Sequence, residues 1–184
     1  MNHSVTSKEE ILSVCRDIVR QEGIQGVNAR RVAGQLGIAL GSLYNYYPGK
    51  EALVMASVAS VWQDILSLDG MQNLSFADTV DRIVHDLASG QKKYPNFFAS
   101  HAMVFGTKAD ARAAMGRMEA GLQQMLKRAL AQDPAVCKEI DPDGFVQLLM
   151  DLINGMVLRN HFNEKIVLDV VNAYAYGGKY GRKK

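Results

Sequence analysis

Residues 28–50 read NARRVAGQLGIALGSLYNYYPGK, and this stretch decides the fold. Asn28 is a good N-cap for a two-turn helix over residues 29–36. A second helix of about two turns follows over residues 40–46, and the Pro48-Gly49 pair is a signal that closes it. Two short helices joined by a turn that begins with glycine are typical of a helix-turn-helix.

The pattern has a steric reason. The sharp angle between the helices needs a residue that tolerates a positive φ at Gly37 and a small residue at Ala33, where the helices cross. Ile38 and Leu43 supply apolar side chains underneath the turn. Many helical hairpins share this spacing, so the spacing alone leaves DNA binding and plain helix packing equally open.

Helical spacing continues on both sides of this stretch. Upstream, Ser7 and Glu10 form a capping box that opens a helix ending at Gly23. The apolar face of that helix consists of Ile11, Cys15, Ile18 and Val19, so Cys15 is expected in the core. Downstream, Lys50 opens a longer helix that frays near residues 69–70. Its apolar stripe consists of Val54, Val58, Val61, Trp62 and Ile65.

Apolar spacing predicts five more helices in the rest of the chain. The first is capped by Ser75 and ends before Pro95, where the next one begins. The others cover about 108–132, 142 to about 162, and 163–176. Since no run alternates convincingly as a strand would, the sequence predicts an all-α fold of about nine helices.

Composition narrows the class of protein. The 184 residues are 48% hydrophobic and 22% charged, which is typical of a folded globular chain. At roughly 150 residues per domain, this length fits one large domain or a small module attached to a larger one. Cys15 and Cys137 lie far apart without a C-x-x-C partner, so neither a disulfide framework nor a zinc site is expected. The polar start, and the lack of an apolar run approaching ~20 residues, predict a cytoplasmic protein that does not span a membrane.

Residues 7 to about 65, about a third of the chain, also resemble the TetR family of bacterial transcriptional regulators. The family pattern has a first helix, a loop containing glycine, and a small DNA-reading unit. Its most specific part here is G-S-L-Y, followed by an aromatic residue and then a lysine that heads the fourth helix. The matching residues are Gly23, Val32, Ala33, Leu36, Gly37, Ile38, Gly41, Ser42, Leu43, Tyr44, Tyr47, Pro48, Lys50, Glu51 and Leu53.

This resemblance implies DNA binding and two domains with different functions. Residues 1–53 would form the helix-turn-helix domain, and residues 54–184 a larger helical domain that dimerises through its last two long helices and holds a small-molecule pocket. The expected function is a dimeric repressor that leaves a pseudo-palindromic operator when an effector binds. A DNA-binding activator, and a nucleoid-type binder without a ligand, stay open as alternatives.

The candidate DNA contacts form two groups. Lys50 lies in the first turn of its helix, where free backbone N–H groups and the helix dipole already favour an anion. Asn45 suits bidentate contact with adenine, and apolar side chains can touch thymine methyl groups. The expected phosphate contacts are Asn28, Arg30, Tyr44, Tyr46 and Lys50. The expected positions on the reading helix are Ala39, Leu40, Gly41, Ser42 and Asn45.

Several of these positions also allow a structural interpretation. Leu40 could simply pack at the start of its helix, and Arg30 and Arg31 could line a solvated face. Tyr47 is expected in the core, where it covers Leu43. The family usually has small polar or basic residues at the start of the reading helix, so this chain offers fewer polar groups for base contacts.

A dimer is a physical requirement of this interpretation. Up to residue 53 the chain has six basic and five acidic residues, a net charge of +1, so a monomer would bind DNA weakly. Two copies double the phosphate contacts at high effective concentration. The half-sites are then expected about one helical turn, or a multiple of it, apart.

A sensor domain needs a cavity with a few polar groups inside an apolar lining. The expected effector contacts are Phe97, Phe98, His101, Phe105, Asn154 and Arg159. For His101, a satisfied core residue is the competing interpretation.

Catalytic patterns give an enzyme little support. No Glu is followed three residues later by His, and no G-x-S-x-G, G-x-G-x-x-G or P-loop run is present. Tyr46 and Lys50 have the Y-x-x-x-K spacing of some dehydrogenases, but Pro48 lies between them. A helical enzyme is therefore the remote alternative, and neither a cofactor nor a metal is expected.

Overall fold

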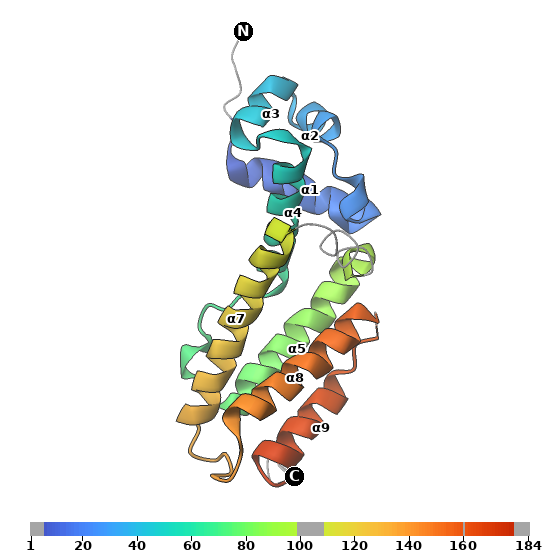
Figure 1. Ribbon diagram of the computed structural model, residues 1–184. Helices are drawn as coiled ribbons and strands as arrows, with labels where there is room; N and C mark the ends of the chain where they lie inside the picture. The colour runs from blue at the N-terminus through green and yellow to red at the C-terminus, as the bar shows by residue number, and fades with distance from the viewer. Residues whose placement is uncertain (1–5, 99–108, 160, 179–184) are drawn as a thin grey trace. The chain divides into compact units, whose positions relative to one another are not determined.

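The computed structural model describes residues 6–98, 109–159 and 161–178, and the regular elements in these ranges are all helices (Figure 1). The described residues form two compact units. Unit 1 holds those up to Ile65 together with residues 90–98, and unit 2 holds residues 66–89 together with those from 109 onward. The all-α prediction, with an N-terminal helix-turn-helix and a larger C-terminal helical part, is confirmed.

Helix α1, Lys8–Glu22, begins at the expected capping box. Ser7 Oγ accepts the N–H of Glu10 at 3.1 Å, and a carboxylate oxygen of Glu10 accepts the N–H of Ser7 at 2.7 Å. Gly23, at φ 77°, ends the helix, and the short 3-10 helix η1, Ile24–Gly26, follows. The predicted apolar face is buried, and burial raises the pKa of the Cys15 thiol.

The helix-turn-helix has the predicted bounds, α2 at Ala29–Leu36 and α3 at Leu40–Tyr46. Asn28 caps α2 by accepting the N–H of Arg30 at 2.9 Å. Gly37 ends α2 in the left-handed region at φ 65°, which glycine adopts without steric cost. Leu43 of α3 is fully buried, so an apolar contact supports the sharp turn.

Helix α4, Gly49–Ile65, begins one residue before the expected Lys50 and ends before the predicted frayed region. Trp62 near its C-terminus packs edge-on against Phe97 and Phe98, at centroid distances of 5.5 and 5.6 Å. A Cβ on Gly90 would lie 2.6 Å from a methyl carbon of Ile65. The Ile65 side chain therefore packs directly on the backbone of Gly90, where a larger residue would collide with it.

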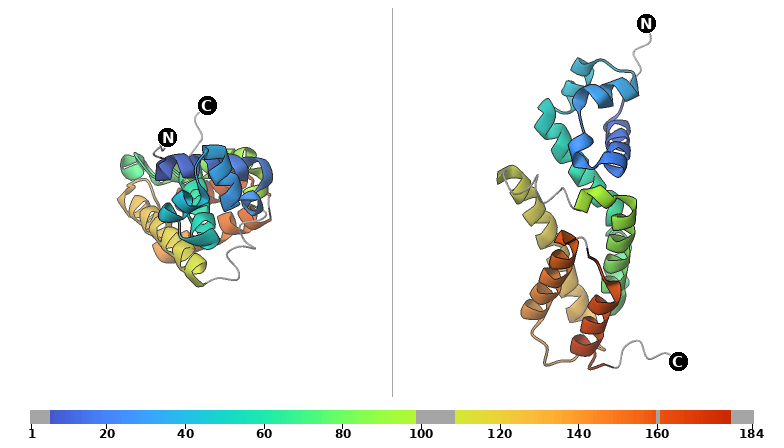
Figure 2. Two further views of the ribbon diagram at one scale, coloured as in Figure 1. Left: turned by 90° about the horizontal axis from the view of Figure 1, so that it is seen from above. Right: turned by 90° about the vertical axis from the view of Figure 1, so that its right-hand side faces the viewer.

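Unit 2 contains the 3-10 helix η2 (Met71–Asn73), most of α5 (Phe76–Lys93), α7 (Ala109–Gln132), α8 (Pro142–Leu158) and α9 (Glu164–Ala175). Helices α7 and α8 are antiparallel neighbours (Figure 2): Lys127 pairs with Asp143 at 2.6 Å, and the Gln123 amide donates to Gln147 at 2.9 Å. Helix α8 is shorter than predicted. It ends at Leu158, where the N–H of His161 donates to the carbonyl oxygen of Met156 at 3.0 Å, the backbone bond that closes a Schellman-type helix end.

Asp133, just after α7, joins three helices of unit 2. Its Oδ2 accepts the N–H of Phe76 at 2.9 Å and the hydroxyl of Tyr176 at 2.6 Å, and its Oδ1 accepts the N–H of Ala135 at 2.9 Å. The Tyr176 hydroxyl oxygen in turn accepts the N–H of Ala77 at 2.9 Å. One carboxylate therefore satisfies free donors at the start of α5 and fixes the end of α9 beside it.

None of the helices in the described ranges is long and apolar enough to span a bilayer. The same ranges contain no group of three His, Cys, Asp or Glu placed to hold a metal ion.

Candidate nucleic-acid interface

Helix α3 presents most of its side chains outward. Leu43 is buried, whereas Ala39, Gly41, Tyr44 and Asn45 are exposed, and Leu40 and Ser42 are half-buried. The five expected base-reading positions thus lie on the accessible part of a helix whose inner side is held by one leucine. Such an exposed short helix is the form that enters a major groove.

Cationic side chains flank this helix in unit 1. Lys50 is exposed in the first turn of α4, and Arg30 is exposed in the first turn of α2. Within the described part of the chain, neither side chain has a hydrogen-bond or ion-pair partner. Asn28 uses its side-chain oxygen to cap α2, which leaves its NH₂ group as a donor.

Arg31 differs from its neighbour Arg30. Its guanidinium donates to both carboxylate oxygens of Glu22, each at 2.6 Å, and these bonds hold the pKa of Glu22 below its ordinary value. The pair ties α2 to the last residue of α1. Arg31 therefore stabilises the packing of α2 on α1. The sequence could not predict this pair, because no periodic pattern links two residues nine positions apart in different helices.

The three tyrosines around the end of α3 have different surroundings. Tyr44 is 41% exposed, and its hydroxyl makes no hydrogen bond to the residues that the structure describes. Tyr46 is half-buried, and its hydroxyl donates to the carbonyl oxygen of Thr6 at 2.5 Å. Tyr47 is 8% exposed, as expected for the core, and burial raises its pKa.

Helix α4 is held against α1 by Arg16. This guanidinium donates to Ser60 of α4 at 2.5 Å and to Glu9 of α1 at 2.6 Å. Ser60 is 3% exposed, so the contact lies beneath the surface. The helix that begins beside Lys50 is thus fixed to the scaffold under the helix-turn-helix.

The expected effector residues do not meet in one unit. Phe97 and Phe98 are buried in unit 1, where they pack on Trp62. Asn154, half-buried, and Arg159, exposed, lie in unit 2, and His101 and Phe105 lie outside the described residues. The effector site stays a prediction.

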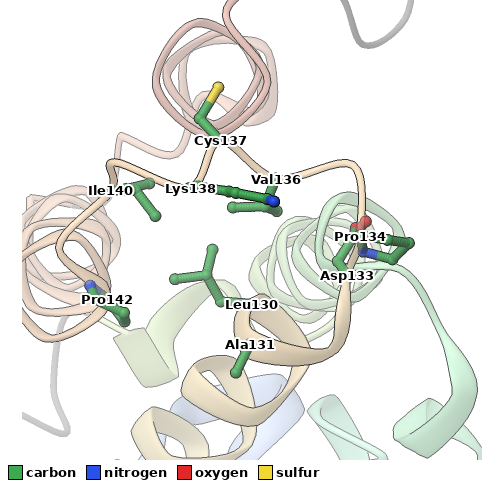
Figure 3. A pocket seen from close by; sticks show the side chains of 9 residues that line it. All are labelled: Leu130, Ala131, Asp133, Pro134, Val136, Cys137, Lys138, Ile140 and Pro142. Carbon is green, nitrogen blue, oxygen red and sulfur yellow. The ribbon is translucent and has the colours of Figure 1, made fainter.

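Unit 2 has a cavity of about 350 Å³ beside the loop between α7 and α8 (Figure 3). Its charged side chains are Asp133, whose carboxylate is already bonded to three donors, and Lys138, which is exposed. Its lining consists of Leu130, Ala131, Asp133, Pro134, Val136, Cys137, Lys138, Ile140 and Pro142. With a single available charge and an apolar wall, it lacks the convergent polar groups that define an effector site.

Comparison with known proteins supports the assignment of the helix-turn-helix. Residues 7–56 match the family model described as bacterial regulatory proteins, tetR family. No curated protein matches the chain.

Two solved structures are similar over nearly their whole length. One is a TetR-family transcriptional regulator, PfmR from Thermus thermophilus, with 14% identity, a TM-score of 0.61, and coverage of 92% of this chain and 95% of that one. The other is a putative TetR-family regulator from Rhodococcus sp., with 16% identity, a TM-score of 0.64, and coverage of 91% and 97%. At these identities the likeness shows the shared all-helical fold.

Proposed function

We propose that this chain, whose residues 7–56 match the model of the tetR family of bacterial regulatory proteins, is a regulator of that family, a homodimeric repressor released from its operator by a small molecule. Transcriptional regulation through DNA is the family's function. The repressor role, the pseudo-palindromic operator, the dimer, the effector and a site of action in the cytoplasm are our proposals.

One observation carries the DNA-binding part of the proposal. An exposed α3, anchored by the fully buried Leu43, lies in the chain between two exposed cations that have no partner in the described residues, Arg30 and Lys50. Such cations are available to replace the counterions of a phosphate backbone. We assign Lys50, Arg30, Tyr44 and the Asn28 amide to phosphates. Asn45 and Ser42 would bond base edges, and Leu40 and Ala39 would touch thymine methyl groups.

Exposed apolar side chains on the last two helices support the dimer. On α8, Leu148 is 51% and Leu158 59% exposed. On α9, Ile166 is 47% and Tyr174 62% exposed. Exposed large apolar side chains on adjacent helices would be favourably buried by a second copy, which would complete a four-helix bundle.

The effector would act through α4. This helix begins beside the proposed phosphate contact at Lys50 and is bonded to α1 through Arg16 and Ser60. A tilt of α4 would move Lys50 and the two copies of α3 relative to the operator half-sites. We propose that the effector contacts the six residues expected from the sequence: Phe97, Phe98, His101, Phe105, Asn154 and Arg159.

Selection of bound fragments from the source genome, followed by salt-dependent affinity measurements, tests the function. We expect a palindromic motif, a protein dimer in solution by light scattering, and an affinity that falls steeply with salt. A stable monomer, or no salt-sensitive affinity for any duplex, would contradict the proposal. A small-molecule thermal-shift screen tests the effector separately: compounds that raise the melting temperature should weaken operator binding, and a screen without such compounds would favour a regulator without a ligand.

A further inference from the structure

Tyr46 is the last residue of α3, and its side chain points back to the segment before α1. Its hydroxyl donates to the carbonyl oxygen of Thr6 across 2.5 Å. Thr6 is only 8% exposed, so its carbonyl lies where a lost bond would not be freely replaced by water. The C-terminal end of α3 is therefore hydrogen-bonded to a residue forty positions earlier in the chain.

Thr6 itself is fixed by the cap of α1. Its Oγ1 donates to Oε2 of Glu10 at 3.3 Å, and the same oxygen accepts the N–H of Ser7 at 2.7 Å. These bonds hold the pKa of Glu10 below its ordinary value, and the bond from the Ser7 N–H has the largest effect. A continuous series of hydrogen bonds thus runs from the α1 capping box through Thr6 to the end of α3.

The donor count of a phenol decides what Tyr46 can do on DNA. A tyrosine hydroxyl has one hydrogen, and phosphate oxygens of a duplex only accept hydrogen bonds. While that hydrogen is given to Thr6, Tyr46 has none to give to a phosphate. Tyr44, two residues earlier, keeps its hydroxyl exposed and without a partner in the described residues, so of the two tyrosines only Tyr44 can donate to a phosphate.

We propose that Tyr46 is a positioning residue, which holds the C-terminal end of α3 through Thr6, and that the α1 capping box thereby sets how α3 lies in the groove. The inference rests on the proposed DNA-binding function and corrects the phosphate role expected for Tyr46. A helix of seven residues is about 10 Å long. A shift at its end therefore reaches Asn45 and Ser42, whose base contacts need close geometry, whereas long cationic side chains can adjust.

The DNA test compares two duplexes: one selected by the wild-type protein from a random-sequence pool, and the unselected pool itself. For Tyr46→Phe, we expect a roughly threefold to tenfold loss of affinity for the selected duplex, the effect of one hydrogen bond, and little change for the pool. For Tyr44→Phe, the matched control, we expect a similar fractional loss on both duplexes, since a phosphate contact carries no sequence information. A merely structural role would lower the melting temperature but leave the ratio of the two affinities unchanged.

A double-mutant cycle links Tyr46 to the cap. If Tyr46 acts through Thr6, Tyr46→Phe costs less in a Glu10→Ala background than in the wild type, whereas Tyr44→Phe costs the same in both. Equal losses for Tyr46→Phe in both backgrounds, or equal losses on the two duplexes, would overturn the proposal.

A measurement without DNA separates this inference from the proposed function. Amide hydrogen exchange at the end of α3 should accelerate in Glu10→Ala as it does in Tyr46→Phe, beyond what an equally destabilised Tyr94→Phe variant shows. Unchanged exchange in α3 for Glu10→Ala would refute the coupling even if the protein binds DNA. Absence of DNA binding by the wild type would refute the regulator, while the exchange result would still decide the coupling.

Discussion

The Tyr94 hydroxyl donates to Oδ2 of Asp64 across 2.6 Å, and the same oxygen lies 2.6 Å from the ammonium of Lys93. Asp64 belongs to the last turn of α4, and the two donors follow one another at the end of α5. Burial raises the pKa of Asp64, but these hydrogen bonds outweigh it and hold the pKa below its ordinary value. Arg20 of α1 lies over the Tyr94 ring, 5.7 Å from its centroid, so this tyrosine contacts both α1 and α4.

Tyr94→Phe should lower the free energy of unfolding by about 1.5–3 kcal/mol, the usual cost of losing a hydrogen bond to a charged group. Tyr94 is fully buried, but the Asp64 carboxylate is 28% exposed and keeps its bond to Lys93, so we expect a loss at the lower end of this range. Denaturant unfolding measures the change. Tyr44→Phe is the control, because Tyr44 is 41% exposed and lies outside the proposed dimer surface; we expect a change within about 0.5 kcal/mol. Equal losses in the two variants would mean that the bond to Asp64 contributes nothing.

The same residue predicts a dependence of stability on alkaline pH. Burial, and then the bond to Asp64, raise the pKa of Tyr94 from its ordinary value to about 12. In the unfolded chain the hydroxyl ionises near pH 10. Between about pH 10 and 12 the folded state therefore binds more protons than the unfolded one, and the free energy of unfolding falls as pH rises.

Comparing the wild type with Tyr94→Phe isolates this effect, because the lysines and the other tyrosines titrate in the same pH range in both proteins. The difference in their unfolding free energies should be constant below about pH 10 and should shrink above it. A difference that stays constant up to pH 12 would show that Tyr94 ionises no later in the folded chain than in the unfolded one.

Local signals explain how much of this fold could be predicted. The bounds of α1, α2 and α3 follow from Ser7, Asn28 and Gly37, because a cap acts on the backbone within a few residues of itself. The partners of Tyr46 and Arg31 could not be predicted, since a phenol that bonds a distant carbonyl leaves no periodic trace in the sequence. The candidate DNA residues followed from the family pattern. The effector residues depend on how whole helices pack, which spacing along one helix does not determine.

Gly90→Ala should destabilise the chain although alanine is the better helix former. A Cβ at this position would lie 2.6 and 2.8 Å from two side-chain carbons of Ile65, which is 6% exposed and has little room to move. We expect a loss of about 1–3 kcal/mol from overpacking. Gly121→Ala, in open space on α7, should instead gain about 0.5–1 kcal/mol.

Rescue by a second substitution tests the cause of that loss. In an Ile65→Ala background, Gly90→Ala should cost nothing or stabilise slightly, since the colliding carbons are gone. A loss that persists in this background would place the strain elsewhere.

The neighbouring arginines of α2 should contribute differently to DNA binding. Arg30 is exposed without a partner in the described residues, whereas Arg31 is bonded to Glu22 at 2.6 Å through two nitrogens. Arg30→Ala should weaken binding to all duplexes and reduce the slope of log affinity against log salt by about 1. Arg31→Ala should leave that slope unchanged, although it removes the same charge. If both variants reduce the slope by about 1, the ion pair between Arg31 and Glu22 opens on DNA. If neither variant reduces it, Arg30 contacts no phosphate.

Lys50 and Asn45 should separate backbone contact from base contact. Lys50→Ala removes a cation from the first turn of α4, so affinity should fall on every duplex alike, with a salt slope smaller by about 1. Asn45→Ala removes an exposed amide from α3 and no charge. It should leave the slope unchanged and relax the preference at one base pair by about 1–3 kcal/mol. Lys138→Ala, an exposed lysine of unit 2, controls for net charge and should alter neither quantity. Equal losses on all sequences for Asn45→Ala would remove this residue from the base contacts and transfer sequence selection to Ser42 and the apolar start of α3.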